Sequence, residues 1–159
     1  MCTVTLTPVA KVCGNNSPGN KTLWVINNAD LVDVPAPTAG VITTDLTLEV
    51  GTTWSKFVFE RNSCRHAEPQ NDGGSVDGTI DCFFGHDDSA KRHQFEQMRN
   101  GLYSVVIEDG NGLVKLVEEC EFKADFDSGE SGSDRNGYQV QFYWTGDSAV
   151  IYEGAIPEA

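Results

Sequence analysis

The chain has 159 residues, 39% of them hydrophobic and 22% charged, which fits a single folded domain. Its 24 acidic and 11 basic side chains give a net charge of −13, which excludes tight binding to nucleic acid or to an anionic membrane surface. No stretch approaches the roughly 18 consecutive apolar residues of a membrane-spanning helix, and no charged start precedes an apolar run. We therefore expect one acidic domain over residues 1–159 that is kept in a cytoplasm and has no membrane partner.

The first part of the chain is rich in Pro, Gly and Asn, chiefly at 13–20 and 33–40. Pro35 and Pro37 favour an extended backbone. These segments predict an extended N-terminal arm over about residues 1–40.

Apolar and polar residues alternate from 41 to 50, which predicts a half-buried strand with Asp45 and Glu49 on its polar face. Residues 54–60 follow so closely that the two segments predict a tight hairpin. The polar stretch 61–74 contains one Pro and two Gly and predicts a long loop.

The period changes at residues 88–100, which predict one short helix. Asp88 or Ser89 supplies an N-cap, and an Asn-Gly pair supplies the stop. The expected apolar stripe consists of the Lys91 stem, Phe95, Met98 and Leu102.

Further alternating segments predict strands at about 75–84, 103–108, 113–126, 138–144 and 149–153. The Asp-Gly-Asn-Gly run at 109–112 predicts a hairpin turn, and the Gly/Ser-rich run 127–137 predicts a second long loop. The apolar side chains of the fourteen-residue segment are expected on one face: Val114, Leu116, Cys120, Phe122, Ala124 and Phe126. This order predicts a mainly β protein, an antiparallel β-sandwich or barrel with one short flanking α-helix.

Candidate chemical sites are few. Cys64, His66, His86 and His93, with Cys82, offer the atoms that bind zinc, but the paired spacings of zinc sites are missing. Cys64 and His66 lie two residues apart on a predicted loop without a signature of nucleophilic use. The sequence therefore predicts no enzyme, no catalytic residue, no metal site and no cofactor.

The acidic run that contains Asp125, Asp127, Glu130 and Asp134 lacks the residue order of a calcium loop, so we expect a solvated tip. The odd number and irregular spacing of the cysteines favour reduced thiols without disulfides. They are Cys2, Cys13, Cys64, Cys82 and Cys120.

Charge is distributed unevenly along the chain. The predicted helix is basic, whereas the residues from Glu118 onward are strongly acidic. Opposite charges on one subunit suit head-to-tail association of identical copies, although both regions could equally be solvated surfaces. The candidate inter-subunit contacts are Lys91, Arg92, Arg99, Glu119, Glu121 and Asp125.

Over residues 40–153 the layout resembles bacteriophage tail tube proteins and the tube proteins of contractile injection systems. The resemblance lies in two adjacent strands, a loop, a strand leading into one helix, and then Val105-Val106-Ile107 followed by Asp-Gly-Asn-Gly. It ends in a hairpin with the run Asp134-Arg135-Asn136-Gly137-Tyr138 before an aromatic strand.

The resemblance implies a structural virion protein whose copies form hexameric rings, stacked as a tube that contacts other tail proteins. It also implies assembly in the host cytoplasm and a final place in the virion tail. DNA would be transiting cargo, because a wall of carboxylates repels phosphate. The predicted hairpin over 41–60 would line the lumen, with Asp45 and Glu49 as candidate lumen residues.

Two other functions fit the same pattern. A tail terminator or neck ring protein of similar fold is one. The second is a β-sandwich that binds carbohydrate or another ligand through exposed Trp24, Trp54 or Tyr143. A small hydrolase or metalloenzyme would require the cysteine and histidine candidates to converge.

Overall fold

The structure is a computed structural model, and it describes residues 6, 8–10 and 16–158. Within that part the chain is mainly β, with one α-helix and one short 3-10 helix. The elements are β1 (Asn20–Asn27), η1 (Asn28–Asp30), β2 (Leu31–Asp33), β3 (Val41–Ile42), β4 (Thr47–Leu48), β5 (Ser55–Phe57), β6 (Arg65–Ala67), β7 (Val76–Gly85), α1 (Ser89–Gln97), β8 (Leu102–Asp109), β9 (Val114–Asp127), β10 (Gly137–Gly146) and β11 (Val150–Tyr152). The predicted mainly β, antiparallel fold with a flanking helix is confirmed.

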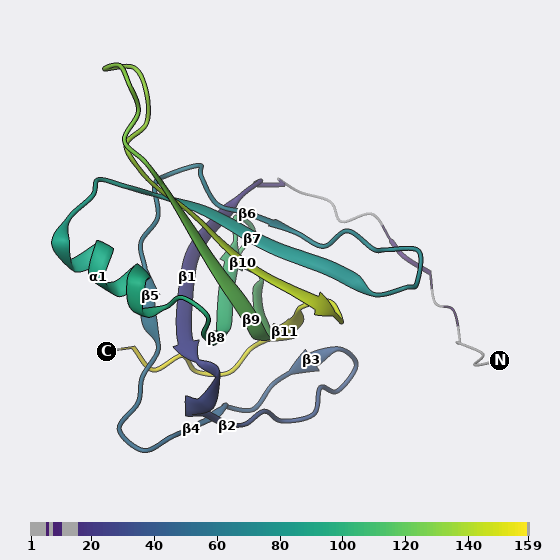
Figure 1. The fold of residues 1–159 in the computed structure, drawn as a ribbon. Helices are drawn as coiled ribbons and strands as arrows, with labels where there is room; N and C mark the ends of the chain where they lie inside the picture. The colour runs from purple at the N-terminus through teal and green to yellow at the C-terminus, as the bar shows by residue number, and fades with distance from the viewer. Residues whose placement is uncertain (1–5, 7, 11–15, 159) are drawn as a thin grey trace.

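One large sheet organises the molecule (Figure 1). Its strand order is β5-β1-β8-β9-β10-β7-β6, all antiparallel, while β11 joins β9 and runs parallel to β3. β2 and β4 form a separate small pair. The large sheet is open, with β5 and β6 at its ends, so of the two predicted architectures the sandwich-like one is correct and the closed barrel is not.

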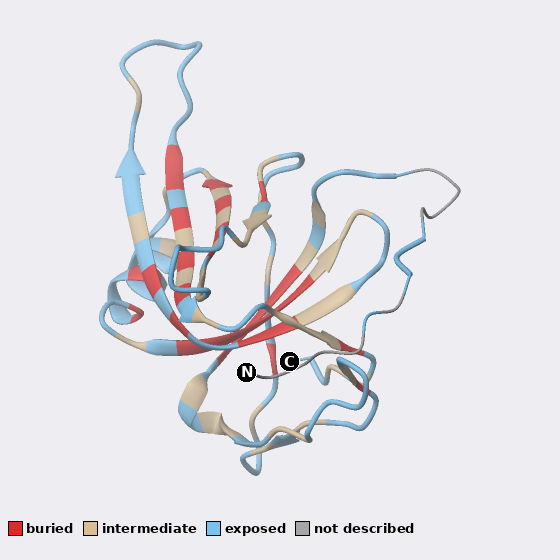
Figure 2. Ribbon diagram, turned by 90° about the vertical axis from the view of Figure 1, so that its right-hand side faces the viewer, coloured by how far each residue is buried: buried red, intermediate tan, exposed pale blue. Residues whose placement is uncertain are grey.

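Apolar side chains cover both faces of the middle of this sheet. The first cluster lies between the sheet and α1, and the second lies under the short strands and the C-terminal segment. Figure 2 shows the buried residues gathered along the middle of the long strands. The second cluster consists of Trp24, Ile26, Ile42, Trp54, Val106, Leu116 and Tyr152. Alternate residues of β1 and β8 enter opposite clusters, because neighbouring side chains of a strand point to opposite faces.

The helix α1 forms where the sequence predicts it, although it ends at Gln97. The Asp88 carboxylate caps it by accepting the Lys91 backbone N–H at 2.7 Å. Phe95 and Met98 enter the first cluster, whereas Leu102 is half exposed and begins β8. Across the residues with described positions, no helix has the length and apolar character to cross a membrane.

A bulge in β9 overturns part of its predicted face. Glu119 has a positive φ of 55°, and between Tyr103 and Val105 of β8 the partner strand advances by one extra residue. Leu116 therefore enters the second cluster while Cys120 enters the first. Sequence alternation placed both on one face, because a bulge at a non-glycine residue leaves no signal in the pattern.

The predicted hairpin over residues 41–60 is wrong. β4 pairs with β2, and β5 pairs with β1, so the two halves do not pair with each other. The C-terminal segment also contacts both halves of this stretch. Trp54 donates its backbone N–H to the Pro157 carbonyl at 2.8 Å, and the Asp45 carboxylate accepts the Ala155 N–H at 2.7 Å. These tertiary contacts override the local alternation.

Two further predictions need correction. The predicted arm over residues 1–40 contains β1, a sheet strand whose residues 23–26 are buried in succession, and β2. Part of that arm, residues 1–5, 7 and 11–15, lies outside the described residues. The predicted loop 61–74 contains β6, which pairs with β7. The predicted loop 127–137 connects β9 and β10 as expected.

Candidate functional site

The far half of β9 has lost one of the two strand neighbours that its near half has. Pairing between β8 and β9 ends at Leu102 and Glu121, so residues 122–127 have β10 as their only strand partner within the described structure. Residues 128–136 extend beyond this pair as a long tip (Figure 1). Figure 2 shows the hairpin becoming exposed toward the tip. We name residues 122–136 the distal hairpin.

The tip is ordered by its own carboxylates. Asp127 accepts the Gly129 N–H at 2.9 Å, and Asp134 accepts the N–H groups of Glu130 and Ser131 at 2.9 Å each. These donors hold the pKa of Asp134 below its ordinary value, because they stabilise the charged form. The acidic tip thus has a defined shape, and its carboxylates serve as hydrogen-bond acceptors.

A polar and aromatic cluster holds the root of the distal hairpin against α1. Arg92 forms an ion pair with Asp87 and places its guanidinium 4.8 Å from the Phe126 ring centroid. The hydroxyl of Tyr138 donates to Asp87 at 2.9 Å. The bonded guanidinium and hydroxyl both lower the pKa of Asp87, the guanidinium most. In the loop before β10, the Arg135 guanidinium lies 3.7 Å from the centroid of the Phe83 ring.

The predicted basic contact residues all have partners in their own chain. Lys91 donates to the carbonyls of Gly85 at 2.6 Å and His86 at 2.8 Å. Arg92 belongs to the root cluster, and Arg99 lies 3.0 Å from the Glu96 carboxylate. The helix is therefore locally balanced in charge, which weakens the argument for a basic docking face.

The predicted acidic contacts do not gather at one point. Glu119 lies in the bulge of β9, Glu121 lies two residues further on, and Asp125 forms an ion pair with Lys123 at 3.7 Å in the distal hairpin. The three residues are exposed and spread along one strand. Their role between subunits stays a prediction.

The candidate lumen residues Asp45 and Glu49 are exposed but do not lie on a hairpin. Asp45 anchors the C-terminal segment, and the Glu49 backbone N–H donates to the Asp30 carbonyl at 2.8 Å. A second surface with carboxylates lies on the large sheet.

That surface is the face of β9, β10 and β7 that points away from the first cluster. Its side chains lie in rows across the strands: Asp125, Gln139 and Phe83; Lys123, Gln141 and Asp81; Glu121, Tyr143 and Thr79. All of them are exposed or half-buried. These nine side chains include three carboxylates and one ammonium, and Arg65 of β6 extends the middle row opposite Asp81. The outer face is therefore polar, with a small excess of carboxylates on a continuous sheet.

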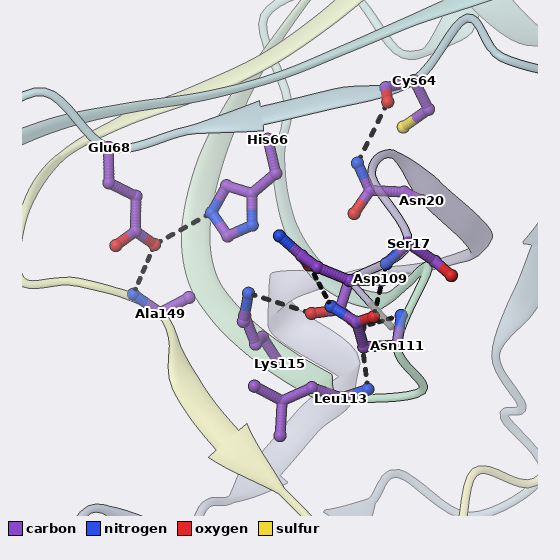
Figure 3. A network of polar contacts seen from close by, with 11 residues as sticks. Ser17, Asn20, Cys64, His66, Glu68, Asp109, Asn111, Leu113, Lys115 and Ala149 are labelled. Atoms are coloured by element: carbon purple, nitrogen blue, oxygen red, sulfur yellow. Dashed lines mark hydrogen bonds and ion pairs between the residues drawn. The ribbon is translucent and has the colours of Figure 1, made fainter. Parts of the chain in front are cut away.

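Two of the cysteine and histidine candidates, Cys64 and His66, line a surface hollow (Figure 3). His66 and the Glu68 carboxylate lie 2.8 Å apart, and that carboxylate also accepts the Ala149 N–H at 2.9 Å. Burial lowers the pKa of His66, partly offset by Glu68, so the ring is neutral at pH 7. Cys82 lies in the core beneath, with Cys64 beside it.

Across the hollow, a second set of contacts fixes the turn before β9. Asp109 accepts the N–H groups of Asn111 and Leu113 at 2.9 Å each and pairs with Lys115 at 3.7 Å. Asn111 accepts the Ser17 N–H at 2.8 Å. These polar groups thus satisfy one another's hydrogen bonds and hold the chain before β1 against the turn.

Among the residues with described positions, no group of three or more His, Cys, Asp or Glu could hold a metal ion. His86 precedes α1 and His93 lies within it, and neither lines the hollow.

The proposed aromatic binding platform is wrong in two of its three residues. Trp24 and Trp54 are 8% and 0% exposed, because both fill the second cluster. Tyr143 is half-buried on the outer face.

Sequence reasoning missed the root cluster and the outer face. Asp87 and Tyr138 are 51 residues apart, and no local spacing indicates that they meet. A signal for the outer face was present, because Gln139, Gln141 and Tyr143 alternate with the aromatic core residues of β10. Comparison of the chain with protein-family models, curated proteins and solved structures found no match.

Proposed function

We propose that this chain is a structural subunit of a phage tail tube, whose copies associate into stacked rings around an acidic conduit for DNA. The observation that supports this best is the distal hairpin. It continues the sheet past its last pairing with β8, and among the described residues no strand pairs with this edge, which a second chain can therefore join. Such an edge is a template for pairing with another strand.

The open ends of the large sheet make this association repeatable. β6 and β5 are edge strands at the two ends of the strand order, so the distal hairpin of one copy can extend the sheet of the next. Contact between two different surfaces of identical subunits is head-to-tail, and it closes into a ring when the rotation allows. In this account a hexamer is the expected ring.

The outer face would form the inner wall of the proposed tube. In a ring built by sheet extension, the rows of β9, β10 and β7 continue from copy to copy and present their carboxylates together. Carboxylates repel the phosphate backbone, so DNA slides past without binding. We therefore move the proposed lumen surface from Asp45 and Glu49 to Glu121, Asp125 and Asp81.

Negative-stain electron microscopy of the concentrated protein tests the proposal. We expect rings or tubes about ten nanometres across, a width set by six domains of this size around a pore. Single rings that never stack would favour the terminator or neck-ring alternative. Particles that stay monomeric at every concentration would contradict assembly altogether.

A shortened variant identifies the surface responsible. Residues 128–136 are replaced by Asn-Gly, a two-residue turn that joins Asp127 to Gly137 directly. We expect this variant to fold, as shown by circular dichroism, and to form rings and tubes only at higher concentration than the wild type, because the edge of residues 122–127 remains while the tip beyond it is removed. Gly132→Ala is the matched control, since an added methyl group there meets nothing within 4 Å. It is expected to assemble normally.

A further inference from the structure

Two buried thiols face each other at the end of the large sheet. β6 pairs with β7 so that Arg65 lies opposite Asp81. This register, continued by one residue before β6, places Cys64 opposite Cys82. The two cysteines are 6% and 0% exposed and belong to the first cluster. The Cys64 thiol is close enough to Cys82 to raise the pKa of the Cys82 thiol.

The backbone contacts define the kind of pair. The Phe83 carbonyl accepts the Glu60 N–H at 2.9 Å and the Ser63 hydroxyl at 3.4 Å, so the polar backbone groups of Phe83 point toward β6. Those of Cys82 therefore point toward β10, where the Cys82 carbonyl accepts a hydrogen bond from the side-chain amide of Gln139 at 3.4 Å. Cys64 and Cys82 thus form a pair without mutual backbone hydrogen bonds, in which Cα atoms lie about 4.5 Å apart. Disulfides span Cα separations of roughly 4.4–6.8 Å.

We propose that Cys64 and Cys82 are a modification site at which a small-molecule disulfide, such as oxidised glutathione, installs a cross-strand disulfide bond. The bond fastens the edge strand β6 to β7. The proposed bond does not depend on the proposed function. The thiols that the sequence predicts to be reduced stay reduced only in a reducing environment.

The reaction balances as two exchange steps. The Cys64 thiolate attacks one sulfur of the small disulfide, forms a mixed disulfide and releases one thiolate. The Cys82 sulfur, on losing its proton, then attacks the Cys64 sulfur and releases the second thiolate. The protein loses two protons and two electrons, and the small disulfide is reduced to two thiols.

The surroundings assign the order of these steps. Cys64 lines the hollow of about 390 Å³ beside Asn20 and His66, whereas Cys82 lies behind it with no exposed surface. The pKa of Cys82 is raised, first by the contact with the Cys64 thiol and then by burial. Cys64 is therefore the attacking residue, and Cys82 resolves the mixed disulfide.

Peptide mapping of the full-length protein tests the site. The protein is reduced, desalted, exposed to oxidised glutathione, alkylated and digested with trypsin under non-reducing conditions. Cleavage after Arg61, Arg65 and Lys91 places the two cysteines on separate peptides, 62–65 and 66–91. We expect these peptides joined by a disulfide within one chain, and a rise in Tm on the order of 5 °C over the reduced protein.

Two variants sharpen the result. Cys82→Ser is expected to trap glutathione on Cys64, and Cys120→Ser is expected to form the bond normally, because β10 separates Cys120 from β7. Recovery of Cys64 and Cys82 as alkylated peptides from the oxidised wild type would overturn the proposal. So would a stable glutathione adduct on wild-type Cys64, or a bond between two chains.

Discussion

The strands β8 and β9 form one hairpin, yet they differ sharply in their surroundings. Residues 103–107 of β8 are buried in succession, with neighbouring strands on both sides and apolar clusters on both faces. Beyond Phe122, β9 keeps a strand neighbour on one side and becomes exposed. The contrast teaches that the stability of the fold comes from the middle of the sheet, which leaves the distal hairpin available for association.

The largest expected effect comes from paired phenylalanine truncations. Phe142→Ala removes a ring that is 0% exposed and whose centroid lies 5.3 Å from that of the Phe122 ring. We expect a loss of about 3–5 kcal/mol in the free energy of unfolding. Phe126→Ala removes a ring that is 41% exposed and should cost about 1 kcal/mol. Urea unfolding measures both. Equal losses of stability in the two variants would contradict the difference between the middle of the sheet and the distal hairpin.

Two glycines give a smaller effect of the same kind. A methyl group on Gly78 would meet the Trp144 ring within the first cluster, and Gly78→Ala should cost about 1–3 kcal/mol because the ring must move. Gly132→Ala, in open space at the tip, should stay within about 0.5 kcal/mol of the wild type. Thermal unfolding followed by tryptophan fluorescence compares them, and a neutral Gly78→Ala would contradict the packing described.

The smallest expected effect is a pH dependence that arises in the body of the protein. Burial lowers the pKa of His66, so protonation favours the unfolded chain. The stability that neutral His66 contributes is fully present above about pH 6.5, the ordinary pKa of a histidine side chain. It is lost as the pH falls below that value toward the lower pKa of His66 in the folded protein.

Urea unfolding at pH 7.5 and 5.5 isolates this contribution. His66→Gln should lose less stability than the wild type between the two values. His93→Gln, at an exposed position of α1, should behave as the wild type does. An unchanged pH dependence in His66→Gln would contradict the burial argument.

Local patterns predicted those parts of the fold that local physics decides. Alternation and turn chemistry located β7, the β8–β9 hairpin and β10, and the cap at Asp88 located the start of α1. Residues 41–60 failed because the partner of Trp54 is the distant Pro157. The bulge at Glu119 failed because alternation assumes an unbroken ladder.

The candidate site was less accessible from sequence than the fold. Charge counts along the chain could not show that Lys91, Arg92 and Arg99 already have partners in their own subunit. Likewise, the continuous apolar run Leu23–Ile26 carried the signal of a strand buried on both faces, but the glycines and prolines around it predicted an arm.

Hydrogen exchange in dilute and in concentrated protein tests the central claim most directly, since it reads the two regions separately. In dilute protein, amides of residues 122–136 should exchange faster than those of 103–107. On assembly, the distal hairpin should become protected by at least about tenfold, while β8 stays unchanged, because pairing with a second chain covers the free edge. Assembly that leaves the distal hairpin exchanging as it does in dilute protein would contradict the account.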